Sequence, residues 1–217
     1  MNELRTAARL AVGCLGFTTL LMARIIYTGT PVYAFLLWNL VLALLPLLFA
    51  GLAVRTRSRM LTGAFGLLWL LFLPNAPYLM TDLIHLRYGN SEGALALLDA
   101  VLLFSGALCG VALGLQSLRW LHTPIKQRWG NLVGWAFAIL SLGLSSVGMY
   151  VGRTLRWNSW DVLTRPRPLL LEMAGYVANP LTHWRMWGII LLFAALLIYL
   201  YWLMDTPFVS KHFSQGV

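Results

Sequence analysis

Apolar residues in this chain are gathered into six long runs that short polar stretches separate. The runs cover approximately residues 7–27, 32–54, 60–73, 94–118, 131–150 and 186–204. Apolar runs of this kind are typical of transmembrane helices, which need about 20 residues to cross the hydrocarbon core of a bilayer. The pattern therefore predicts an all-α, integral membrane bundle of about six transmembrane helices, built as a single domain over residues 1–217.

The third run is too short for a simple crossing helix, because it covers only residues 60–73 and is followed by Pro74 and Pro77. Proline disfavours the helical conformation of the residue before it, so Leu73 and Ala76 are expected to leave the helix. A broken backbone at membrane depth must be buried against protein or line a wet cavity. We therefore predict a third helix that is broken at Pro74–Pro77 and frames a cavity.

The composition supports a membrane protein, since 59% of the residues are hydrophobic and only 11% are charged. Soluble domains carry about 25% charged residues. The net charge of +9 would suggest nucleic acid as a partner in a soluble protein. Here the basic residues flank apolar runs, so we expect them to contact membrane lipids and expect no nucleic-acid partner.

The basic residues of the short loops also predict the topology. With six spans, two short loops and both termini lie on one side of the membrane. The basic residues of these two loops are Arg55, Arg57, Arg59, Arg119, Lys126 and Arg128. Because short cytoplasmic loops are enriched in lysine and arginine, both termini are predicted to be cytoplasmic.

A first polar block follows the broken third run and contains Asn75, Tyr78, Asp82 and His85. Spacings of four and three residues allow the last three to share one helical face. An aspartate beside a histidine holds one imidazole tautomer and raises its basicity. Asp82 and His85 are therefore a candidate acid–base pair, with Asn75 and Tyr78 as candidate ligand-binding residues. The plainer alternative is that this block caps and solvates an interfacial helix.

A second polar block follows the fifth run and contains Arg153, Arg156, Asn158, Trp160 and Asp161. If the fifth helix continues outward, Arg153, Arg156 and Trp160 share one face. Two arginines on one face offer many donors to a carboxylate or phosphate, although they also suit simple snorkelling to headgroups. The predicted topology places both blocks on the outer side. We therefore expect one outer-facing pocket, with these five residues as candidate ligand-binding residues.

Asp99 lies inside the fourth run, where a charge at the bilayer centre costs about 2.5–3.5 kcal/mol. It is therefore expected near the interface, paired with an arginine, or protonated. We include it among the candidate ligand-binding residues, and a structural ion pair is the alternative. Further along, Arg165–Pro168 is expected to be extended, and residues 169–176 form an apolar piece that suits the membrane surface.

No zinc-binding His-Glu-x-x-His pair, Gly-x-Ser-x-Gly elbow or phosphate-cradling loop occurs in the sequence. Asp82, His85 and Asp161 have the ligand types of a metal site, but their spacing does not select one. We therefore predict neither a metal nor a cofactor.

The segments Phe72–Tyr78 and Thr81–Leu86 resemble an uncharacterised bacterial membrane family, the domain of unknown function 1361. Gly152–Asp161 is similar to the second signature block of that family. The resemblance spans most of the chain, from about the second run to the sixth. It implies a bacterial multipass protein and carries no established activity or catalytic residues. We expect the protein in the bacterial cytoplasmic (inner) membrane.

The leading functional hypothesis is a pocket that binds an anionic group, namely a lipid or envelope-precursor headgroup. A membrane-embedded transferase or hydrolase that uses Asp82 and His85 is an alternative. A small proton-linked transporter that uses Asp99 is another, and a structural or assembly subunit is a third. The sequence does not separate an enzyme from a binding protein and identifies no protein partner.

Overall fold

The computed structural model describes residues 2–88 and 92–205, and every regular element in these two ranges is helical. The elements are α1 (Asn2–Thr28), α2 (Phe35–Arg55), α3 (Arg59–Phe72), α4 (Asn75–Tyr78), the 3₁₀-helix η1 (Leu79–Ile84), α5 (His85–Tyr88), α6 (Gly93–Thr154), α7 (Asp161–Thr164), α8 (Pro166–Ala178) and α9 (Trp184–Asp205). The predicted all-α class is therefore confirmed. Residues 206–217, a short polar tail by sequence, lie outside the described residues.

Five helical segments within the described residues are long and apolar enough to cross a membrane. They are Arg5–Thr28, Phe35–Arg55, Arg59–Arg87, Gly93–Thr154 and Trp184–Asp205. The fourth contains two of the six predicted spans, because α6 is interrupted at Gly130, whose φ of 88° and ψ of 169° are not helical. Glycine reaches this region without steric cost. We call residues 93–129 and 131–154 the first and second limbs of α6.

The outer surface of the bundle is apolar over much of its area. Leu67, Leu97, Leu132 and Leu140 are among the large apolar side chains that are exposed on α3 and on both limbs of α6. In water such a surface would drive aggregation, whereas in a bilayer it meets lipid chains of equal polarity. The chain is therefore a multipass membrane protein.

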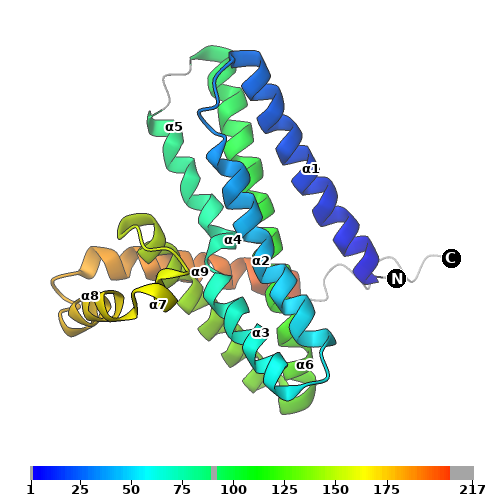
Figure 1. Cartoon of the computed structure of the whole chain (residues 1–217), viewed down its shortest axis with the longest axis vertical. Helices are drawn as coiled ribbons and strands as arrows, with labels where there is room; N and C mark the ends of the chain where they lie inside the picture. The colour runs from blue at the N-terminus through cyan, green and yellow to red at the C-terminus, as the bar shows by residue number, and fades with distance from the viewer. Residues whose placement is uncertain (1, 89–91, 206–217) are drawn as a thin grey trace.

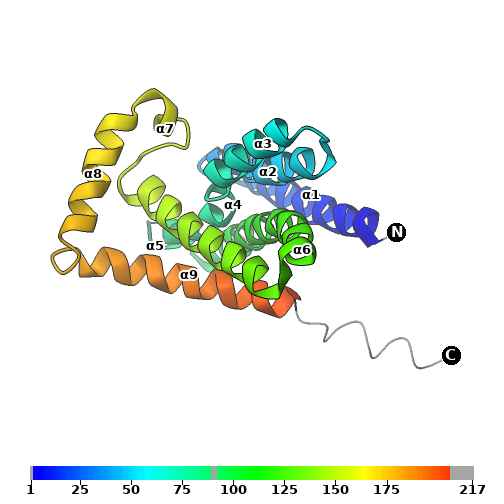
Figure 2. The same ribbon diagram turned by 90° about the horizontal axis from the view of Figure 1, so that it is seen from below.

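The long helix α6 is the common packing partner of the bundle, because α1, α2, α4, η1 and α9 all contact it. Figure 1 shows α1, α2 and the first limb of α6 running along the long axis of the molecule, with α3 beside the lower part of α2. In both views α9 crosses this direction steeply, and Figure 2 shows α7 and α8 projecting from the side of the bundle.

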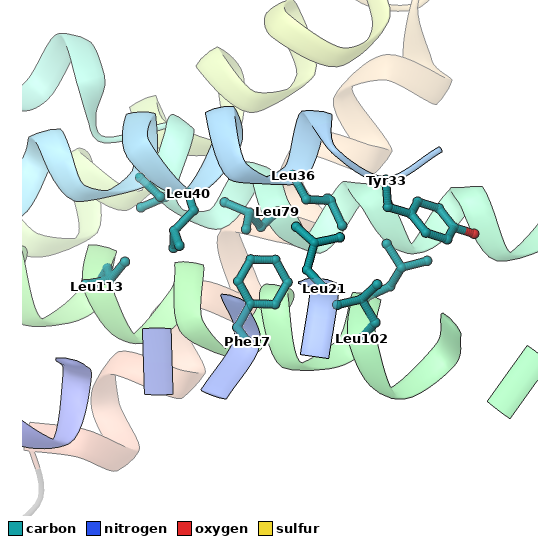
Figure 3. Close-up of a cluster of buried hydrophobic side chains, with 11 residues drawn as sticks. Phe17, Leu21, Tyr33, Leu36, Leu40, Leu79, Leu102 and Leu113 are labelled. Atoms are coloured by element: carbon teal, nitrogen blue, oxygen red, sulfur yellow. The ribbon is translucent and has the colours of Figure 1, made fainter. Parts of the chain in front are cut away.

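One hydrophobic cluster joins the helices of the upper half of Figure 1. It includes Phe17 and Leu21 from α1, Leu36 and Leu40 from α2, Leu79 from η1, and Leu102 and Leu113 from α6 (Figure 3). All of these side chains are buried. The cluster therefore holds η1, the continuation of the broken third helix, against three other helices.

The break in the third helix is a change of hydrogen-bond pattern and not an extended segment. α3 ends at Phe72, but Leu73 keeps φ −51° and ψ −39°, and Ala76 lies inside α4. The prediction that Leu73 and Ala76 leave the helical conformation is therefore wrong. The N–H of Ala76 donates to Leu73 O (3.2 Å), and the Asn75 side chain donates to Phe72 O (3.0 Å). These bonds satisfy the freed carbonyls while the chain tightens into the 3₁₀ turn.

Close approach of α4 to both limbs of α6 depends on two glycines. A Cβ at Gly110 would collide with the backbone oxygen of Ala76, and a Cβ at Gly148 would collide with the ring of Pro74. The proline segment therefore lies clamped between the two limbs of α6.

We predict that Gly110→Ala lowers stability by about 1–3 kcal/mol, the usual cost of overpacking a rigid contact. Alanine is a better helix former than glycine, so a loss must come from the collision with Ala76 and the tight contact with Leu79. Gly143→Ala is the matched control, because no atom lies within 4 Å of its added Cβ. Thermal unfolding in detergent measures both, and equal midpoints for the two variants would contradict the packing.

Candidate ligand-binding site

Asp82 is the centre of a buried polar network that joins three helical elements. Its side chain is only 1% exposed. Oδ2 accepts a hydrogen bond from Asn39 Nδ2 of α2 (2.9 Å), and Oδ1 accepts one from Arg153 Nη2 of α6 (2.9 Å). A carboxylate in such a place needs a paired charge and hydrogen bonds to both oxygens. Asp82 has both, so it ties η1 to α2 and to the end of α6.

Arg153 contacts the first polar block through both of its terminal nitrogens, while its buried Nε has no hydrogen-bond partner among the described residues. Besides Asp82, it donates to Thr81 O (2.6 Å) and to Tyr78 Oη (3.2 Å), and its guanidinium lies 5.1 Å from the centroid of the Tyr78 ring. The planar guanidinium can serve several acceptors at once. Arg153 therefore connects the two polar blocks, and its charge is already balanced by Asp82.

His85 lies beside Asp82 without a hydrogen bond to it. The distance between His85 Nε2 and Asp82 Oδ1 is 3.9 Å, which exceeds hydrogen-bond length. The imidazole packs on Phe35, with ring centroids 5.0 Å apart. Since both oxygens of Asp82 already accept other hydrogen bonds, the geometry favours a structural role for this pair over acid–base work.

The fifth predicted helix does not continue outward far enough for Arg153, Arg156 and Trp160 to share one helical face. α6 ends at Thr154, and Arg156 has a φ of 60°. A residue in this left-handed region ends a helix and turns the chain away from its axis. At Arg156 the backbone therefore turns into a loop, and Arg156 does not lie on the helical face that carries Arg153.

The loop after α6 is tied down at three points. Asn75 Nδ2 of α4 donates to Ser159 Oγ (2.9 Å), and Trp157 Nε1 donates to Glu172 Oε2 of α8 (2.8 Å). The Asn158 N–H donates to Asp161 Oδ2 (2.7 Å), and this bond lowers the pKa of the Asp161 carboxyl. The loop thus rests on α4 and is bonded to α8.

Helix α8 begins at Pro166, so the prediction of an extended segment Arg165–Pro168 is also wrong. Proline suits the first turn of a helix, where its missing N–H would have no partner.

A cavity of about 540 Å³ lies between α2, α3, α4, the second limb of α6, the loop and α8. Its polar lining residues are Asn39, Asn75, Tyr78, Asn158 and Ser159. Its apolar lining residues include Trp38, Leu42, Leu70, Leu71, Leu144, Val147, Val151, Leu169, Leu170 and Met173. A largely apolar cavity with a few convergent polar groups is the usual form of a ligand site.

Apart from Asp99, the predicted site residues divide into three groups. Asn75, Tyr78, Asn158 and Trp160 line the cavity, whereas Asp82, His85 and Arg153 do not and the ion pair lies outside its lining. Arg156 and Asp161 line a shallower hollow that shares Trp157, Asn158 and Trp160 with the cavity and also includes Arg165. Arg165 was not among the predicted site residues.

Asp99 belongs to a separate ion pair. Its Oδ1 accepts from Arg24 Nε of α1 (2.9 Å), and its side chain is 3% exposed. Arg24 also donates to Thr30 Oγ1 (3.0 Å) and lies 4.7 Å from the Tyr33 ring centroid. Burial and the neighbouring carboxylate of Asp99 raise the pKa of Tyr33. The arginine-paired alternative for Asp99 is the one observed, and this pair ties α1 to α6.

Asn39 is a member of the site that sequence reasoning did not select. The sequence could have indicated it, because Asn39 is a lone amide side chain within the apolar second run. Ser159 and Glu172 carried no such signal. Among the described residues, no group of three or more His, Cys, Asp or Glu side chains is placed to hold a metal ion.

We predict that Arg153→Met lowers stability by about 3 kcal/mol, because it leaves the Asp82 carboxylate buried without a counter-charge. Adding Asp82→Asn to Arg153→Met should recover part of this loss, since the amide carries no charge. Arg156→Met, which changes an exposed arginine nearby, is the control and should unfold like the wild type. Thermal unfolding in detergent measures all three, and no recovery in the double variant would contradict the assigned pairing.

Comparison with known proteins locates the chain in a family. No curated protein and no solved structure matched the sequence. Residues 38–200 match the family described as "Protein of unknown function (DUF1361)", and this range includes both polar blocks. Because the match covers well over half of the chain, the protein belongs to the DUF1361 family.

Proposed function

We propose that this protein binds an anionic amphiphile, a lipid or an envelope precursor, in the cavity beside the proline segment. The supporting observation is the order of residues along its walls. Leu70 and Leu71 precede Asn75 and Tyr78 along α3 and α4, and all four line the cavity. One end of the cavity thus suits an apolar chain and the other end suits a polar headgroup.

The second limb of α6 repeats this order, because its apolar lining residues Leu144 and Val147 precede the polar loop residues Asn158 and Ser159. Figure 1 shows α3 and this limb rising from the same lower end of the molecule. The apolar ends of the two walls therefore face each other. Binding of a molecule with a polar head and an apolar tail follows from this arrangement.

The preference for an anion rests on Arg156 and Arg165 at the rim. Both are exposed and line the hollow that adjoins the headgroup end of the cavity. Guanidinium groups bind phosphate and carboxylate through paired hydrogen bonds. Asp161 shares the hollow, so the two arginines leave it with an excess positive charge. Arg153, which is already neutralised by Asp82, is not part of this proposed contact.

The sidedness of the site is part of the proposal. The arginines of the short loops support cytoplasmic termini in a bacterial cytoplasmic membrane. The polar loop and α8 then lie at the outer surface, where the apolar side chains Leu170, Leu171 and Val177 of α8 can enter the lipid interface.

Catalysis and proton transport have less support from the geometry. Both oxygens of Asp82 accept hydrogen bonds from other side chains, and Asp99 is paired with Arg24. The remaining alternative is a structural subunit whose polar network only fixes its helices. That alternative predicts no bound amphiphile, so a binding measurement separates the two.

Native mass spectrometry of the protein purified with native lipids tests the proposal. We expect a discrete lipid adduct on the wild type and its loss in Val147→Trp, because the indole fills the cavity. Leu140→Trp is the matched control, since Leu140 lies on the same limb of α6, is exposed and does not line the cavity. An adduct that persists in Val147→Trp would refute the site.

The rim arginines provide a separate test of charge preference. The double variant Arg156→Gln/Arg165→Gln should bind an anionic lipid at least about tenfold more weakly, because each charge-assisted hydrogen bond contributes about 1.5–3 kcal/mol. Binding of a zwitterionic lipid should change much less. Equal weakening for both lipids in a titration would contradict the anionic preference.

A further inference from the structure

A second cavity, of about 470 Å³, lies where α2 ends beside the first limb of α6. Its lining includes Arg55 of α2 and Gln116, Arg119, Trp120 and Thr123 of α6. Residues 116, 119, 120 and 123 have the three- and four-residue spacing of one helical face. Two arginines and no acidic residue line this cavity within the described part of the chain, so it is a strongly cationic site.

Arg55 is held in place by contacts within its own helix and with α6. Its Nη1 donates to Gly51 O (3.4 Å), and its guanidinium carbon lies 5.9 Å from the Trp120 ring centroid. A Cβ at Gly51 would come within 2.8 Å of Arg55 Nη1. The missing side chain at Gly51 therefore leaves the space in which the guanidinium lies. Only one of its five N–H donors is used by Gly51.

Gln116 gives an independent indication that the cavity receives a polar ligand. Its side chain lines the cavity and the residue is only 7% exposed. It makes no hydrogen bond to any residue in the described ranges. Its amide atoms are not among the side-chain atoms that the protein encloses without a partner, so they are reachable from the cavity and can bond to a polar group that enters it.

We propose that this second cavity binds a phosphate-type anion between Arg55, Gln116 and Arg119. Guanidinium groups match the oxygen geometry of a phosphate, and the amide N–H of Gln116 supplies a further donor. The ligand is either the phosphate of an anionic lipid or a free phosphate group. Arg55 and Arg119 belong to the loops predicted to face the cytoplasm, where anionic lipid headgroups concentrate.

The test counts bound molecules by native mass spectrometry during two titrations, one with short-chain phosphatidylglycerol and one with inorganic phosphate. Arg119→Gln and Gln116→Leu should each lose one bound molecule or weaken its binding about tenfold. Arg57→Gln is the matched control, because Arg57 is an exposed arginine close to Arg55 but does not line the cavity. Higher ionic strength should weaken the same binding event.

The two titrations distinguish the sources of the phosphate. Loss of a lipid molecule in Arg119→Gln assigns the site to a lipid headgroup, and loss of inorganic phosphate assigns it to a free anion. Failure of both ligands to bind would overturn the proposal, as would equal loss in Arg57→Gln. A lipid lost in Val147→Trp instead of Arg119→Gln belongs to the first cavity, so the two proposals fail separately.

Gly51→Ala tests the positioning of Arg55 without removing any polar group. The added methyl should displace the guanidinium and weaken phosphate binding several-fold. The thermal midpoint should change little, because alanine favours the helix, the Arg55 end that it meets is flexible, and the Trp120 ring at 3.3 Å needs to shift by only a few tenths of an ångström. Binding equal to that of the wild type would show that Arg55 does not hold the ligand.

Discussion

The buried carboxylate of Asp82 is the constraint on which the outer half of the molecule depends. A charge at 1% exposure in an apolar bundle is tolerated only if its partners reach it from fixed directions. Asn39 of α2 and Arg153 of α6 both donate hydrogen bonds to this carboxylate, so it connects the two helices. The network therefore holds the last turn of α6 against η1, and the loop that follows starts from this position even though Arg153 does not line the cavity.

The proline segment and the glycines of α6 supply the space around this network. Pro74 and Pro77 remove two helical hydrogen-bond donors, so the third helix is interrupted before α4, where Asn75 reaches the loop. Gly110 and Gly148 let the two limbs of α6 approach that segment closely. The Asn75–Ser159 hydrogen bond then fixes the loop and, through Trp157 and Glu172, positions α8 beside the cavity.

The fold class could be predicted from the lengths of the apolar runs. The contact between the two polar blocks could be predicted from the membrane topology, because a sequence displays apolar runs and basic loops directly. The local geometry was less accessible. The proline rule favours extended backbone before Pro77, but burial of Ala76 against Gly110 and Gly114 keeps this residue helical. The helix end at Thr154 depends on a left-handed backbone at Arg156. Such a helix end is usually marked by a glycine in the sequence, and here the residue is an arginine. Asn39 acquires its role only through contact with Asp82, 43 residues away in the sequence.

Hydrogen–deuterium exchange of the wild type and Arg153→Met in lipid nanodiscs shows whether one ion pair positions the wall of the cavity. We expect faster exchange in η1 and also in residues 155–164, while α1 keeps its protection. The distant loop responds because its place depends on where α6 ends. Faster exchange confined to η1, with residues 155–164 unchanged, would show that the loop and the cavity are held independently of Asp82 and Arg153.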